Sequence, residues 1–165
     1  MRIAPTAFNS DRLSIYLNDH LAGATFGSEL ARRAAGQNRG TEFEVELEQL
    51  ATDIDADRAE LERIIDTLGK PRDQIKPRLA WAAEKAGRLK PNGRLFGYSA
   101  LSRFEELELL LIGVNGKLSM WRALDHALHE RLGGIDIPEL EARAESQRER
   151  LEALRLRAAD EALTP

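Results

Sequence analysis

Two histidines one helical turn apart are the residues of this sequence whose spacing most directly suggests metal chemistry. They are His126 and His129, with Asp125 and Glu130 beside them. Side chains at i and i+3 share one helix face, so both imidazoles can reach one cation. Charged groups at a helix end are also stabilised by solvent and by the helix dipole, and we favour that interpretation. The third histidine, His20, is predicted at the inner face of a helix, bonded to a neighbour rather than to a metal.

The 165-residue chain lacks the residues that several common kinds of catalysis need. It has no cysteine, which excludes disulfides, thiolate metal sites and cysteine nucleophiles. It also has no glycine-rich phosphate loop, catalytic triad or zinc motif. Asn92-Gly93-Arg94 and Gly133-Gly134 are turn sequences. We therefore predict no cofactor.

Positive charge is concentrated between Lys70 and Arg103. Nine basic and two acidic residues give this segment +7, and the rest of a chain of net charge −4 then carries −11. A basic patch is predicted at Lys76, Arg78, Lys85, Arg88, Lys90 and Arg94. Such a patch suits phosphate, nucleic acid or anionic lipid. The segment also has an apolar helical stripe, so we favour its packing on the acidic helices, and we do not expect nucleic-acid binding.

Four long amphipathic helices are predicted to position these residues, over about 11–35, 41–68, 102–132 and 136–162. Residues 1–10 precede them as a flexible arm. The predicted helix starts are capped by Ser10, by Thr41 with Glu44, by Ser102 with Glu105, and by Asp136. Along the second helix, apolar residues recur every three or four positions at Leu47, Leu50, Ile54, Leu61, Ile64 and Leu68. That spacing predicts one buried face, interrupted at Asp57 and Arg58.

The lengths of the connections predict how the helices are arranged. Short loops make antiparallel neighbours, so residues 11–69 and 99–162 are predicted to form two hairpins. The connector 70–98, with its own short helix over about 74–86, is long enough to run back along helices that span roughly 35–40 Å at about 1.5 Å per residue. We therefore predict an all-α, antiparallel four-helix bundle in one domain, 11–162, with a long crossover.

The two hairpins match each other at a fixed offset of ninety residues, without a gap. The identical pairs are Leu17 and Leu107, Leu21 and Leu111, Gly23 and Gly113, Arg32 and Arg122, Leu50 and Leu140, Arg58 and Arg148, Leu61 and Leu151, and Glu62 and Glu152. Amphipathic helices rich in Leu, Glu and Arg also match by chance. The constant offset and the glycine pair favour an internal duplication.

The start of the first helix, Tyr16-Leu17-Asn18-Asp19-His20-Leu21-Ala22-Gly23, resembles that of small bacterial ferritin-like domains. The resemblance covers residues 11–162 by pattern and includes the crossover between two hairpins. It implies two metal ions, held by a Glu from each of the first and third helices and by a Glu-x-x-His motif from each of the other two. In that motif, a Glu and a His at i and i+3 reach the metal from one helix face.

This sequence departs from the ferritin-like pattern at every ligand. The equivalent positions carry Asp55 and Arg58 in the second helix, Glu145 and Arg148 in the fourth, and Gly23 and Gly113 in the first and third. Arginine has no lone pair for a metal, so we infer that the di-metal site is lost. If both arginines point inward, the carboxylates neutralise them in a central ion-pair cluster, and the glycines leave room for the guanidinium groups. The alternative is that both arginines reach the surface.

The missing ligands favour a non-catalytic bundle that acts as an interaction or structural module, as a homodimer or with a protein partner. Two alternatives stay open. One is an iron- or manganese-dependent oxidoreductase with unusual ligands such as His20, Asp55, Glu105 and Glu145, and the other is an anion-binding module that uses the basic patch. No signal peptide is recognised, and the longest apolar run, 109–114, is too short for a transmembrane segment. We expect a cytoplasmic protein.

Overall fold

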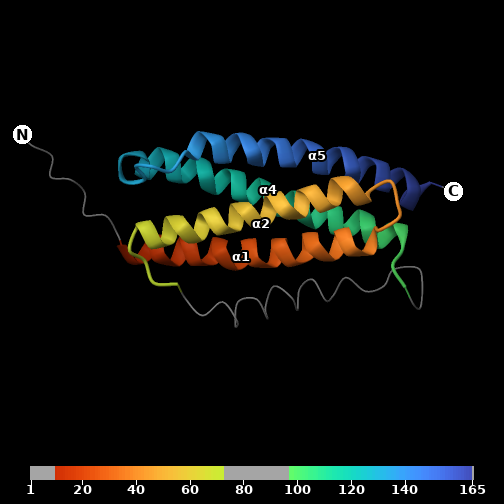
Figure 1. The fold of residues 1–165 in the computed structure, drawn as a ribbon, viewed down its shortest axis with the longest axis horizontal. Helices are drawn as coiled ribbons and strands as arrows, with labels where there is room; N and C mark the ends of the chain where they lie inside the picture. Colours follow the sequence, from red (N-terminus) through yellow and green to blue (C-terminus); the bar gives the residue numbers. More distant parts are fainter. Residues whose placement is uncertain (1–9, 73–96, 165) are drawn as a thin grey trace, which may run out of the picture.

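The computed structural model describes residues 10–72 and 97–164, which form four long α-helices (Figure 1). Their bounds are α1 Ser10–Gln37, α2 Glu44–Thr67, α4 Ala100–Leu128 and α5 Ile137–Leu163, and a 3-10 turn, His129–Arg131, follows α4. The described residues contain no β-strand, so the prediction of an all-helical bundle of four helices is confirmed. Residues 1–9 of the arm predicted over 1–10, and the predicted connector helix, lie outside the described residues, while residue 10 already begins α1.

Each helix packs on two others. In Figure 1, α1 and α5 run from left to right, whereas α2 and α4 run from right to left. The helix α1 contacts α2 and α4, and α5 contacts α4 and α2, so α1 and α5 lie at diagonal corners. Side-chain contacts at the corners agree with these directions: Arg33 Nε donates to Glu106 Oε1 at 3.0 Å, and Arg150 Nη1 donates to Asp53 Oδ2 at 2.7 Å.

One predicted cap forms as expected, and those of α2 and α4 are shifted along the chain. Asp136 caps α5 as predicted, because its carboxylate accepts from Glu139 N at 3.0 Å. The cap of α4 is Ser99 rather than Ser102, three residues earlier, and its hydroxyl accepts from Ser102 N at 3.1 Å. Before α2, Glu44 bonds back to Gly40 N at 2.8 Å, so the predicted capping box is displaced by one residue. The preceding helix, α1, extends to Gln37, two residues beyond its predicted end at 35.

The apolar core has two parts, one toward each end of the bundle. One cluster includes Phe43 and Leu107, and the other includes Leu61 and Trp121. On α2, every predicted stripe position is buried except Leu68, which is half-buried. The two clusters are separated on α2, α4 and α5 by one polar residue each, Asp57, Lys117 and Gln147. The core of the bundle is therefore polar at its middle and apolar toward both ends.

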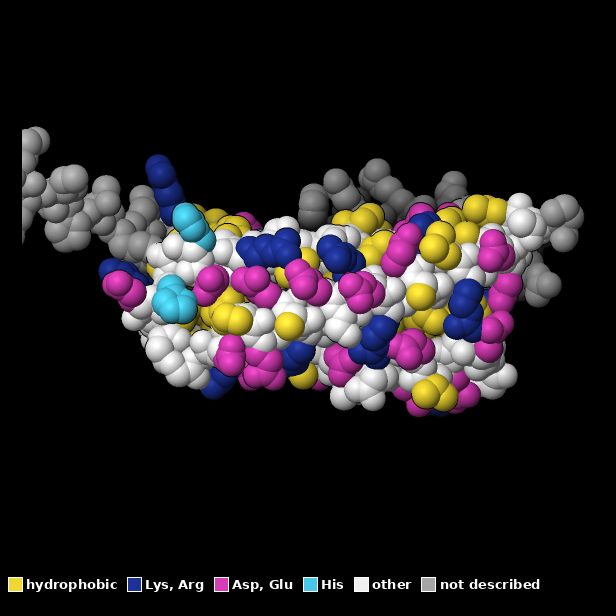
Figure 2. Space-filling model, turned by 90° about the horizontal axis from the view of Figure 1, so that it is seen from above, with side chains coloured by type: hydrophobic (Ala, Val, Ile, Leu, Met, Phe, Trp, Pro, Cys, Tyr) yellow, Lys and Arg dark blue, Asp and Glu magenta, His cyan; other side chains and the backbone are white. Residues whose placement is uncertain are grey.

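The outer face of α5 carries charges of both signs. Figure 2 shows this face, with acidic and basic side chains interspersed along its whole length. Arg155, for example, lies between Glu152 of its own helix and Glu108 of α4. Exposed ion pairs of this kind contribute at most about 1 kcal/mol each, so the face is a mixed, solvated surface rather than a patch of one sign. None of the described helices combines the length and the apolar character that a membrane crossing requires.

Candidate functional site

A polar cluster joins three helices in the middle of the bundle. The Asp57 carboxylate from α2 is fully buried, and its Oδ2 accepts from Lys117 Nζ of α4 at 2.5 Å. The same oxygen accepts from Gln147 Nε2 of α5 at 2.8 Å. Lys117 Nζ also donates to Gln147 Oε1. The three side chains therefore form a closed ring of hydrogen bonds, which we call the central cluster.

A second cation lies on the other side of the central cluster. Arg143 Nη2, from α5, is 2.5 Å from Asp57 Oδ1, although the two atoms do not have hydrogen-bond geometry. One carboxylate thus faces two cations, which leaves one net positive charge when Lys117 is protonated. Burial lowers the pKa of Lys117, and the neighbouring carboxylate of Asp57 opposes that shift. The central cluster is therefore a buried site with excess positive charge.

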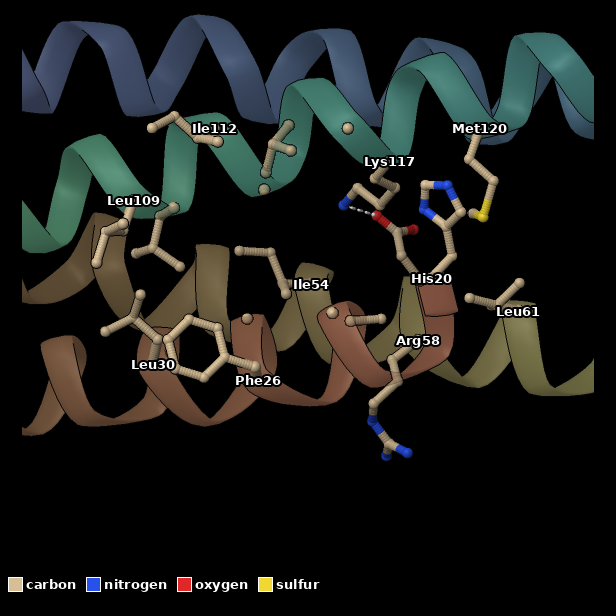
Figure 3. Close-up of a pocket in the computed structure, with 18 of the residues that line it drawn as sticks. His20, Phe26, Leu30, Ile54, Arg58, Leu61, Leu109, Ile112, Lys117 and Met120 are labelled. Carbon is tan, nitrogen blue, oxygen red and sulfur yellow. Dashed lines mark hydrogen bonds and ion pairs between the residues drawn. The ribbon is translucent and has the colours of Figure 1, made fainter. Parts of the chain in front are cut away.

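An apolar groove of about 430 Å³ opens beside the central cluster, between α1 and α4 (Figure 3). One end is apolar and includes Phe26, Leu30, Ile54, Leu109 and Ile112. Toward the other end, His20 of α1 and Lys117 of α4 approach each other across the groove, with Leu61 and Met120 beside them. Ile112 is 67% exposed on the groove's rim, which is unusual for a large aliphatic side chain. The groove thus combines a long apolar part with a polar end.

Four glycines widen this groove. They are Gly23 and Gly27 of α1 and Gly113 and Gly116 of α4. A Cβ added at any of the four would meet no atom within 4 Å. Close contact between the helices therefore does not require these glycines. Their effect is to leave space where side chains would otherwise fill the groove.

His20 closes the polar end of the groove from the side of α1. Its ring lies edge-on to the ring of Tyr16, with the ring centres 4.6 Å apart. Burial lowers the pKa of His20, an effect that the nearby Asp19 opposes. The imidazole is therefore neutral at pH 7. His20 is half-buried and lines the groove, near the inner face where it was predicted, and the neighbour that it contacts is the aromatic ring of Tyr16.

The predicted central pair of Asp55 and Arg58 forms, but on the outside of the bundle. Arg58 Nε donates to Asp55 Oδ1 at 3.1 Å, and Arg58 Nη1 donates to Glu62 at 2.5 Å. The Ser28 hydroxyl also donates to Asp55 at 2.7 Å, and together with Arg58 and Arg32 it lowers the pKa of Asp55 to about 2. The Asp55 side chain is 41% exposed, and Figure 3 shows Arg58 directed away from the groove.

The second predicted pair, Glu145 and Arg148, does not form. Glu145 is 44% exposed and binds Arg122 of α4 at 2.5 Å, while Arg148 has no hydrogen bond or ion pair within the described ranges. The single four-residue cluster predicted for the bundle centre is therefore wrong. Successive residues of an α-helix are about 100° apart, so positions 55 and 145 point away from positions 57 and 147. The centre is occupied by Asp57 and Gln147, ninety residues apart.

The sequence contained a signal for the central residues. Asp57 lies three residues after Ile54 and four before Leu61, so it belongs to the buried stripe at its apparent interruption. Gln147 has the same relation to Ala144 and Leu151. Gly23 and Gly113, predicted to make room for guanidinium groups, instead line the groove close to Lys117.

The other predicted ligands are not brought together. His129 binds Asp125 at 2.9 Å and is 76% exposed, and His126 is also exposed. Across residues 10–72 and 97–164, no three His, Cys, Asp or Glu side chains form a group that could hold a metal ion. This applies equally to the unusual set His20, Asp55, Glu105 and Glu145. The predicted basic patch, from Lys76 to Arg94, lies outside the described residues.

Comparisons with known proteins identify no family for this chain. No family model, curated protein or solved structure matches the chain. The function therefore has to be argued from the central cluster and the groove themselves.

Proposed function

We propose that this chain is a ferritin-like four-helix bundle that acts as a non-catalytic binding module, with the central cluster in place of a di-metal site. The arrangement of the helices supports this proposal. In Figure 1, α2 ends at the left of the bundle and α4 begins at the right, so the chain crosses the full length between its two hairpins. A crossover at this point is the feature that separates ferritin-like bundles from simple up-and-down bundles.

The observation that carries the proposal is the position of the Lys117 ammonium. A ferritin-like di-metal site needs four carboxylates to balance two divalent cations. In the middle of this bundle, Asp57 is a buried carboxylate that already binds Lys117 at 2.5 Å and faces Arg143 at 2.5 Å. The equivalent residue of the other hairpin is Gln147, which is neutral. A divalent cation would meet excess positive charge and too few anionic ligands.

The matching burial of the two hairpins supports a common origin of the central residues. Six buried positions of α2 match buried positions of α5 at the ninety-residue offset, in the pairs Leu47 and Ile137, Leu50 and Leu140, Ile54 and Ala144, Asp57 and Gln147, Leu61 and Leu151, and Ile64 and Leu154. Asp57 and Gln147 thus occupy matching positions of the two helices. We interpret them as the present occupants of positions that once served one symmetric site.

Metal analysis tests the proposal directly. We expect full-length protein, purified without chelators, to contain well below one iron or manganese ion per chain. We also expect its melting temperature to be unchanged by added Fe²⁺ or Mn²⁺, because a ligand that binds the folded state would raise it. About two metal ions per chain, or a metal-dependent rise in melting temperature, would refute the proposal and favour the oxidoreductase alternative.

A further inference from the structure

We propose that the groove between α1 and α4 binds a linear aliphatic carboxylic acid, with its carboxylate at Lys117 and its hydrocarbon chain toward Phe26 and Leu30. This inference deepens the proposed function, since it names a ligand class for the binding module. It rests on the shape of the groove, on the charge of the central cluster and on the distribution of polar groups along the groove.

The dimensions of the groove suit a chain-like molecule. Its polar end is at His20 and its apolar end at Leu30, ten residues further along α1, which corresponds to about 15 Å of helix. Its volume of about 430 Å³ lies within the range of about 300–1,000 Å³ that is usual for small-molecule sites. The glycines keep the walls open along this length, because a Cβ at any of them would meet nothing within 4 Å.

The charge of the central cluster favours an anionic head group. Lys117 has three N–H donors, of which one binds Asp57 and one binds Gln147. The described parts of the chain supply no acceptor for the third donor. A ligand carboxylate at this point would accept that hydrogen and balance the positive charge that Arg143 contributes.

The remaining polar groups of the groove fit the same ligand. His20 faces Lys117 from α1, and its neutral imidazole can donate a second hydrogen bond to a carboxylate. Arg58 is held by its own helix and points away, while Asp19 lies exposed at the rim. The polar atoms are thus grouped toward one end of the groove, beside Leu61 and Met120. A ligand with one charged end and an otherwise apolar body matches this distribution better than a polar metabolite does.

A binding measurement on the full-length chain tests the inference. The protein is stripped of bound lipid and titrated with dodecanoic acid, and in parallel with dodecan-1-ol, which has the same chain without the charge. We expect binding of one acid per chain, with a Kd about tenfold or more below that of the alcohol, because a charged hydrogen bond is lost with the alcohol. Absence of acid binding would overturn the inference. This holds whatever the cause, including a groove covered by residues 73–96 or by a second copy of the chain.

Two variants locate the site. The double variant Asp57→Asn/Lys117→Met removes both charges together, so that no buried charge is left unpaired between them. It should weaken acid binding about tenfold and alcohol binding much less, because an uncharged hydroxyl accepts a weaker hydrogen bond from the ammonium than a carboxylate does. Gly27→Leu should fill the groove and abolish binding of both ligands, whereas Gly36→Leu, on the same helix but outside the groove, should bind as the wild type does.

The outcomes separate this inference from the proposed function. Acid binding that neither variant weakens would place the ligand elsewhere and overturn the inference. Failure to bind acid by a protein that also lacks metal would refute the ligand but leave the non-catalytic bundle standing. Bound metal would refute the proposed function whatever the acid does.

Discussion

Replacing Lys117 by Met is the perturbation that most directly tests the structure of the central cluster. The Lys117 side chain is 13% exposed, and the Asp57 side chain is fully buried. Removing one partner of a buried ion pair costs about 3–5 kcal/mol, because the remaining charge is left without compensation. Arg143, 2.5 Å from the other carboxylate oxygen, retains part of that compensation. We therefore expect Lys117→Met to lower the free energy of unfolding by about 3 kcal/mol.

A substitution of the partner residue, Asp57, and the double variant complete a double-mutant cycle. Asp57→Asn should cost less, about 2 kcal/mol, since burial already lowers the pKa of Lys117 and the amine can lose its proton. Asp57→Asn/Lys117→Met removes both charges and should cost only about 1 kcal/mol, because no buried charge is left between the two positions. The cycle should thus give a coupling energy of about 4 kcal/mol.

Urea denaturation of the four proteins at pH 7 measures these free energies. The matched control is the exposed pair Glu60 and Arg63 on α2, whose Arg63 side chain is 55% exposed. The cycle Glu60→Gln and Arg63→Met should give a coupling energy of about 0.5 kcal/mol or less. If the effects of the substitutions at Asp57 and Lys117 simply added, the reasoning about a buried, mutually dependent pair would be refuted.

Two further predictions concern the groove and the outer ion pair. Gly23→Ala and Gly116→Ala should each stabilise the fold by about 1 kcal/mol, because Ala favours a helix over Gly and the added methyl meets nothing within 4 Å. Thermal melts check this, and a fall in melting temperature would show that the groove is filled. Asp55→Asn should cost about 1 kcal/mol at pH 7, discounted for exposure of the carboxylate. The folded-state pKa of Asp55 is lowered from 3.8 to about 2, so this stabilisation is present above pH 3.8 and lost as the pH falls toward 2. Urea titrations of the wild type and Asp55→Asn at pH 7 and pH 2 measure the difference in the free energy of unfolding. A cost of Asp55→Asn that persisted at pH 2 would contradict a lowered pKa of Asp55.

The local features of the fold were predictable because they depend on short spacings in the sequence. The recurrence of Leu47, Leu50 and Ile54 on α2 follows from the helical repeat alone. The cap at Asp136 depends on residues within one turn. The burial of a face and the start of a helix can therefore be inferred without knowing what packs against them.

The site could be predicted only in part, because it depends on which side of each helix faces the centre. The spacing of Asp55 and Arg58 resembles that of a Glu-x-x-His metal motif, and the sequence prediction therefore placed these two residues at the centre. The phase of the buried stripe instead places Asp57 at the centre, two residues and about 200° of helix rotation away. The role of Lys117 was missed altogether, since a lone lysine in an apolar helix has no local partner; its partners come from α2 and α5.

The central cluster also explains how helices with such repetitive apolar faces keep one register. Leucine-rich stripes can pack almost equally well after a slide of one turn, about 5.4 Å, because each turn presents a similar surface. Such a slide of α4 would carry Lys117 away from Asp57 and into one of the two apolar clusters that flank it. Lys117 would then be buried without a partner, and Asp57 would keep only Arg143 and Gln147 of α5. Burying an unpaired charge costs several kcal/mol, so only one register satisfies both groups. Helix α1 lies outside the central cluster. The hydrogen bonds from Ser28 to Asp55 and from Arg33 to Glu106 fix its register against α2 and α4, and this keeps His20 opposite Lys117 in the groove.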